Sequence, residues 1–190
     1  MKKKKTDLES RFWSGRSKLS PVALGGVFFQ FHDLATAKER LNLMMQYAVQ
    51  GKTRIPEDPS VVFHFHQSLR SLIRAGWCLR KKPGKWTVEA VPETGNPLLY
   101  GSLSEEEYRD PVCVFRKAFK AYRTEELEDF LSDIVYFSLG TFHNVPERDI
   151  VGPYLHLMKM LDAAWLIVER KNRKKELFQS LPQEDEVYIP

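Results

Sequence analysis

The chain of 190 residues is 43% hydrophobic and 12% aromatic, which is too apolar for a disordered protein and enough to build one buried core. Its net charge of +4 is unevenly divided, because residues 1–100 carry +9 and residues 101–190 carry −5. This asymmetry indicates either a basic face for an anionic partner such as nucleic acid, or two regions that neutralise each other in the fold.

The beginning of the chain indicates in which cellular compartment the protein is expected. Residues 1–18 are expected to form a basic, flexible tail, and the lysines at positions 2–5 are followed by no apolar segment of the kind that an export signal needs. The longest apolar segments, 22–31 and 154–168, are too short or too interrupted to cross a membrane. We therefore expect a cytoplasmic protein without membrane contact.

The first predicted elements are an irregular segment and a helix. Paired glycines within residues 22–29 disfavour a regular helix, so a buried loop or a short strand is expected there. A helix is predicted over residues 33–50, where apolar residues recur every three or four positions and Gly51 suits the position beyond the end.

A second helix and a hairpin are predicted next. The helix covers residues 58–75, with a proline at its first helical position and Gly76 at its end. Residues 77–80 and 86–91 have strand-like composition and flank a turn that contains adjacent Pro and Gly. The pattern predicts a small β-hairpin over residues 77–91.

The rest of the chain is expected to be helical. Residues 92–103 contain Gly, Asn and Pro, and they form the one loop where a subdomain boundary can fall. The predicted helices start at Ser104, Pro111, Thr124 and near Pro153, and the last should be central because its apolar face is the widest.

Together these elements predict a mainly α fold, a compact bundle of about five helices with one small hairpin. A single domain is expected over residues 19–178, followed by a C-terminal tail over residues 179–190. The two cysteines, Cys78 and Cys113, lack C-x-x-C spacing and are expected to be reduced, packed thiols.

The predicted second helix and hairpin form the leading candidate site. A helix followed by a basic hairpin is also how a winged helix-turn-helix ends, and cations that reach phosphates beside aromatic rings suit nucleic-acid binding. The ordinary alternative is a lysine-rich turn that keeps a hairpin tip in water and tryptophans that join two strands. The candidate nucleic-acid-binding residues are Arg70, Arg74, Trp77, Arg80, Lys81, Lys82, Lys85 and Trp86.

A second basic stripe lies on the predicted helix that follows Pro111. It comprises Arg116, Lys117, Lys120 and Arg123. Acidic residues crowd positions 125–129 directly afterwards, so the stripe is expected to pair with the next helix rather than with a ligand.

No catalytic or metal site is predicted. His64 and His66 are two positions apart on a predicted helix, so their side chains diverge and cannot share an ion. Asp162 is expected to be an exposed or paired structural acid rather than a catalytic one. Signature motifs for dinucleotides, phosphate loops and common hydrolases are absent from the sequence, so no cofactor is expected and an enzyme is the least favoured class.

Two function classes are favoured, and an enzyme is a distant third. The first is a non-enzymatic regulatory or interaction protein that binds nucleic acid through its basic first half. The second is a helical protein–protein adaptor or homodimeric scaffold without a role in nucleic-acid binding. One large apolar patch and no continuous basic stripe would favour the adaptor.

Overall fold

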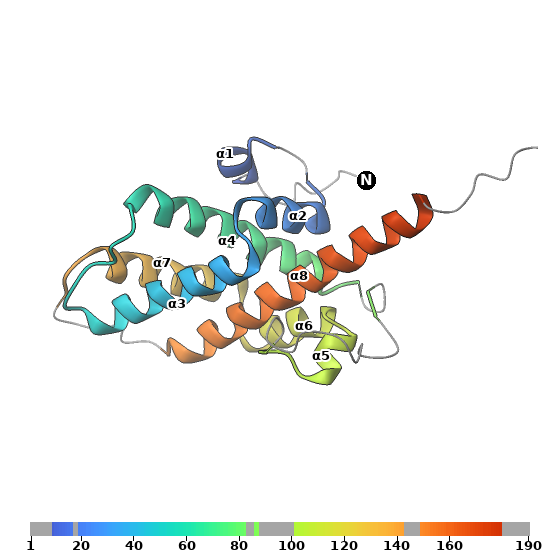
Figure 1. The fold of residues 1–190 in the computed structure, drawn as a ribbon. Coiled ribbons are helices and arrows are strands. Elements are labelled where there is room, and N and C mark those ends of the chain that lie inside the picture. Colours follow the sequence, from blue (N-terminus) through green and yellow to red (C-terminus); the bar gives the residue numbers. More distant parts are fainter. Residues whose placement is uncertain (1–8, 17–18, 83–85, 88–100, 143–148, 180–190) are drawn as a thin grey trace, which may run out of the picture.

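The computed structural model describes residues 9–16, 19–82, 86–87, 101–142 and 149–179. Within these ranges the chain is mainly helical and contains no strand (Figure 1). No helix in the described part is long and apolar enough to span a membrane. The helices are α1 (Ser10–Ser14), α2 (Pro21–Phe31), α3 (Leu34–Gln50), α4 (Pro59–Leu79), α5 (Glu105–Arg109), α6 (Val112–Ala121), α7 (Thr124–Leu139) and α8 (Val151–Gln179).

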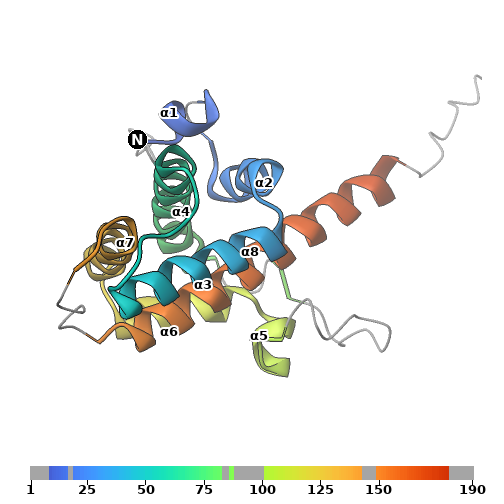
Figure 2. The ribbon, with the colours of Figure 1, turned by 60° about the vertical axis from the view of Figure 1, so that its left-hand side comes forward.

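The long helices α4 and α8 each pack against several other helices. Helix α4 packs against α1, α2, α6, α7 and α8, and α8 packs against α2, α3, α4, α5 and α6. Helices α3 and α8 lie side by side in both views (Figures 1 and 2). The C-terminal end of α8 extends beyond the other helices (Figure 2). The expectation of a central last helix agrees with this packing.

Several predicted elements are confirmed by their terminal residues. The Asp33 carboxylate accepts the Thr36 N–H at 2.9 Å at the start of α3, and Gly51 follows the helix in the left-handed conformation. Ser104 and Glu107 form the predicted capping box of α5. Both cysteines are free thiols; Cys78 is half-buried and Cys113 is buried.

The expectation of a loop or strand over residues 22–29 is wrong, because α2 occupies this segment. The Ser20 hydroxyl accepts the Ala23 N–H at 3.3 Å, and Pro21 suits the first turn. The glycines permit close helix packing: a Cβ on Gly25 would lie 3.3 Å from Val168 of α8. Contact with α8 therefore outweighs the low helix propensity of two glycines.

The predicted hairpin is not confirmed. Its first strand, residues 77–80, is wrong, because α4 continues through Leu79 and Arg80 is its C-cap. Residues 86–87 are irregular, while 83–85 and 88–91 lie outside the described residues. Tertiary packing explains why the helix continues past Gly76. This glycine was expected to end the helix, but it lies within α4, where the Phe115 ring of α6 packs against it.

The described residues contain more helices than the expected five, because α1 and α2 were not predicted and because α1 and α5, with five residues each, are counted as helices. Helix α1 falls inside the segment expected to be a tail, and its Trp13 is buried. Trp13 donates its indole N–H to the Ser71 hydroxyl of α4 at 2.9 Å. Most of the expected tails and of the 92–103 loop lies outside the described residues.

The close packing at Gly76 leads to a stability prediction. A Cβ added there would lie 2.6 Å from the buried Phe115 ring, so Gly76→Ala is expected to lower the free energy of unfolding by about 1–2 kcal/mol. Gly26→Ala is the matched control: its nearest neighbour would be 4.0 Å away, and the gain in helix propensity should be up to about 1 kcal/mol. Urea unfolding of both variants measures the contrast; equal effects would contradict it.

Candidate functional site

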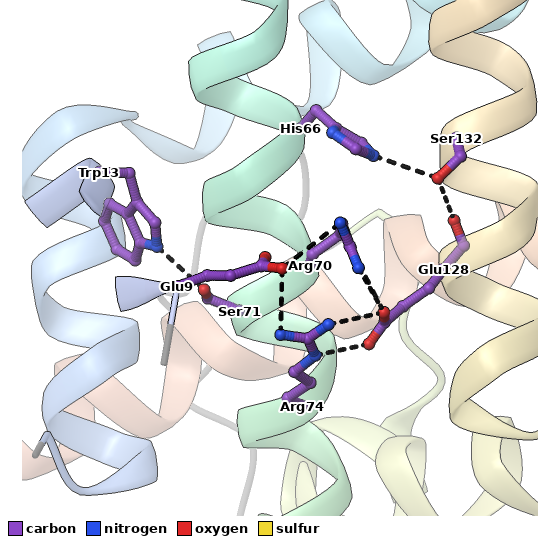
Figure 3. Close-up of polar contacts among 8 residues, drawn as sticks. All are labelled: Glu9, Trp13, His66, Arg70, Ser71, Arg74, Glu128 and Ser132. Atoms are coloured by element: carbon purple, nitrogen blue, oxygen red, sulfur yellow. Dashed lines mark hydrogen bonds and ion pairs between the residues drawn. The ribbon is translucent and has the colours of Figure 1, made fainter. Parts of the chain in front are cut away.

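Arg70 and Arg74, expected to bind phosphates, form an ion network with two glutamates (Figure 3). Arg74 donates to Glu128 of α7 at 2.7 and 2.8 Å, and Arg70 donates to the same carboxylate at 3.0 Å. Glu9 lies 3.4 Å from both guanidinium groups. Two positive and two negative charges cancel, so these arginines contribute little positive potential.

Burial and the charge of Arg70 act in opposite directions on the pKa of Glu128 and in the same direction on the pKa of His66. Burial would raise the pKa of Glu128, but hydrogen bonds and positive charge from Arg74 and Arg70 outweigh it and hold that pKa below its usual range. Burial and the charge of Arg70 lower the pKa of His66 to about 4. His66 donates to the Ser132 hydroxyl at 3.3 Å, which in turn donates to the Glu128 carbonyl at 2.9 Å.

Of the other residues predicted to bind nucleic acid, four lie together in the structure and Trp86 lies apart from them. Trp77, Arg80, Lys81 and Lys82 stay together at the C-terminal end of α4, and all except the half-buried Arg80 are exposed. Trp86 is buried, and its carbonyl accepts a hydrogen bond from Arg170 of α8. Its ring therefore cannot stack on a base. Lys85 lies outside the described residues.

The second basic stripe pairs mainly with residues that precede it. Arg116 donates to Asp110 at 2.7 Å. Lys117 reaches Glu106 at 3.1 Å and Glu107 at 3.2 Å. Arg123 meets the acidic start of α7, where it contacts Glu126 at 3.2 Å, and it is the one residue of the stripe with such a contact among the described residues. The expected pairing with the next helix is thus limited to that last residue.

A concave aromatic surface lies on the same side of α4 as the ion network. We call it the α4–α7 groove; it has a volume of about 390 Å³ and adjoins the His66–Ser132 contact. Phe63 and Tyr136 are 50% and 61% exposed, although both are large and apolar. The Tyr136 ring stacks on Phe142 at 4.7 Å. The lining residues are Phe63, His66, Ser132, Val135, Tyr136, Leu139, Gly140 and Phe142.

The sequence contains only a weak signal for this groove. Phe63 and Tyr136 lie outside the apolar stripes of their helices, so each places an aromatic ring on a face that should be polar. A lone exposed aromatic residue is common, and only the packing of α4 on α7 brings the two together.

A buried Ser–His pair elsewhere is structural rather than catalytic. His32 donates to the Ser68 hydroxyl at 3.1 Å, and Ser68 donates to the Phe65 carbonyl at 2.8 Å. Arg40 donates to the other ring nitrogen of His32 at 3.3 Å. Burial and the charges of His64 and Arg40 lower the pKa of His32 to about 4, so it is neutral. Ser68 is fully buried and cannot reach a substrate.

Acidic and histidine side chains do not assemble a metal site in the described residues. His64 and His66 lie on α4, as expected, and no group of three potential metal ligands occurs in this part of the chain. Asp162 is completely buried and accepts hydrogen bonds from Lys38, at 2.9 Å to each oxygen, and from Ser102. It is a paired structural acid.

Comparison with models of protein families, with curated proteins and with solved structures finds no match to this chain. The candidate function therefore rests on the site itself.

Proposed function

We propose that this protein is a non-enzymatic interaction protein, and that the α4–α7 groove binds an uncharged, apolar segment of a partner protein. One observation carries the proposal: none of the described residues that line the groove is charged, although 28% of the chain is charged. Exposed apolar surfaces of this kind typically mark interaction sites.

The lining defines the chemistry of the partner. Phe63 and Tyr136 offer half-exposed rings, and the stacked Phe142 holds Tyr136 in place before binding. A charged side chain of the partner would be desolvated here without a counter-ion, so the contacting residues should be apolar or aromatic. The neutral His66 and Ser132 provide the polar edge. The groove is open, which suits side chains projecting from a peptide.

Two other surfaces support the proposal less well. A cavity of about 670 Å³ between α2 and α8 has charged lining residues, including Arg16, Glu169 and Arg173, and so lacks the same apolar character. Nucleic-acid binding through the complete set of predicted residues loses support because Arg70 and Arg74 are neutralised and Trp86 is buried.

Selection from random peptides displayed on phage tests the groove. We expect peptides rich in aromatic and aliphatic residues that bind the wild-type protein. A Phe63→Lys/Tyr136→Lys variant should bind them at least about 30-fold more weakly, since these rings are central contacts. Fluorescence anisotropy with a labelled selected peptide measures the change.

Leu155→Lys/Val151→Lys is the matched control, because it alters two similarly exposed apolar residues on α8. It should retain full affinity. Selected peptides that bind the groove variant as well as the wild type would exclude the groove, as would a failure to select any peptide. Light scattering adds a third outcome: a wild-type dimer that becomes monomeric only in the groove variant would identify a second copy of this chain as the occupant instead.

A further inference from the structure

We infer that the C-terminal end of α4 and the adjoining face of α6 form one basic, aromatic surface that binds single-stranded nucleic acid. We call it the α4–α6 surface; it comprises Trp77, Arg80, Lys81, Lys82, Phe119 and Lys120. It shares no residue with the α4–α7 groove, so each proposal can be tested independently of the other.

Packing between the two helices joins basic segments that are far apart in the sequence. The Phe115 ring covers Gly76, which brings α6 against the last turns of α4. One turn further along α6, the Phe119 ring meets the Trp77 ring edge to face at 5.2 Å. Lys120 follows Phe119 on α6, so a further cation lies one residue from this contact with α4.

The cations of this surface are available to a ligand. Lys81, Lys82 and Lys120 are exposed, and none has an ion-pair partner among the described residues. They differ in this respect from Arg116 and Arg123, which are paired with acidic residues. Lys81 and Lys82 follow the end of α4 and Lys120 lies in the last turn of α6, so all three also complement a helix dipole.

The aromatic part of the surface favours nucleic acid over an acidic protein. Trp77 is 38% exposed, and the Arg80 guanidinium lies 3.4 Å from its ring centroid. The Arg80 Nε is buried without a hydrogen-bond partner in the described part of the chain, so the ring is its principal contact. The guanidinium covers one face of the ring, so a base of a single strand would contact the exposed remainder of Trp77 while its phosphates meet the lysines.

Fluorescence anisotropy with labelled oligothymidylate and oligouridylate of about 20 nucleotides tests this inference, at about 50 and about 200 mM salt. We expect binding that weakens with salt. Lys81→Ala/Lys82→Ala/Lys120→Ala should lower the affinity at least about tenfold and flatten the logarithmic salt slope by about 2, the value for three lost contacts to a single strand. Trp77→Leu should lower the affinity at least about fivefold.

The control Arg11→Ala/Lys52→Ala/Arg54→Ala removes the same charge from exposed positions elsewhere. It should bind almost as the wild type does, and so should a chain lacking the lysines at positions 2–5. Thermal unfolding verifies that each variant is folded. Equal loss in both triple variants, no binding at low salt, or binding that disappears with the lysine tail would overturn the proposal. Equal affinity for polyglutamate would reassign the surface to an acidic protein.

Discussion

Replacing Asp162 with Ala is expected to lower the free energy of unfolding by about 3 kcal/mol. The carboxylate is 0% exposed and accepts hydrogen bonds from Lys38 and Ser102. Its removal leaves the Lys38 ammonium, whose side chain is only 20% exposed, without its partner at the surface of the core. Partial access to water limits the loss to the lower end of the range for buried ion pairs. Urea unfolding at neutral pH measures the effect.

A double substitution separates the role of the pair from that of the space it fills. In Lys38→Met/Asp162→Leu both charges are replaced by apolar groups, so much of the stability lost in Asp162→Ala should return. Glu125→Ala, at an exposed position on α7, should change stability by no more than about 0.5 kcal/mol. If the double variant is as unstable as Asp162→Ala, the ion pair is not the source of the effect.

Local signals in the sequence were sufficient for the helices whose ends are defined by their own residues. Asp33 and Gly51 bound α3, and the Ser104–Glu107 capping box starts α5, because caps act within one turn of the chain. The same reasoning failed at Gly25 and Gly76. A glycine is read locally as a break, but both of these glycines provide room for a side chain from another helix, which no local pattern reveals.

The candidate sites depend even more on distant contacts. Glu128 lies 54 and 58 residues from the arginines that it neutralises, and nothing near Arg70 or Arg74 indicates that pairing. Likewise, the two basic segments of the α4–α6 surface are brought together by the packing of Phe115 on Gly76 and of Phe119 on Trp77. Which charged residues are paired and which are exposed is therefore a property of the tertiary fold.

Helix α4 connects both proposed surfaces. Its Phe63 and His66 line the α4–α7 groove, whereas its last turn carries Trp77 toward α6. The arginines between them are fixed by Glu128 and Glu9, which keeps the helix in register against α7 and α1. A protein segment in the groove and a nucleic-acid strand at the helix end would thus occupy separate parts of one rigid element.

Acidification from pH 7 to about 4 is expected to lower the free energy of unfolding by about 3 kcal/mol, through His32 and His66 together. This is about half of what the two full pKa shifts would give, because partial access to solvent screens both groups. Each has a pKa of about 4 in the fold, against 6.5 for an ordinary histidine, chiefly because burial disfavours the charged ring. Between pH 6.5 and 4 the unfolded chain therefore binds more protons than the folded one, and stability falls as pH falls. Above pH 6.5 both states are neutral and the contribution is complete.

Urea unfolding of the wild type and of a His32→Asn/His66→Asn variant at several pH values measures this dependence. The variant should be less stable at pH 7, because hydrogen bonds to Ser68 and Ser132 are altered, yet its stability should change little between pH 6.5 and 4.5. Acidic groups act in a lower window: the pKa of Glu107 is about 2, since the hydrogen bonds from Lys159 and Ser104 outweigh its burial. A wild-type profile that is flat above pH 4.5 would show that neither histidine is held neutral by the fold.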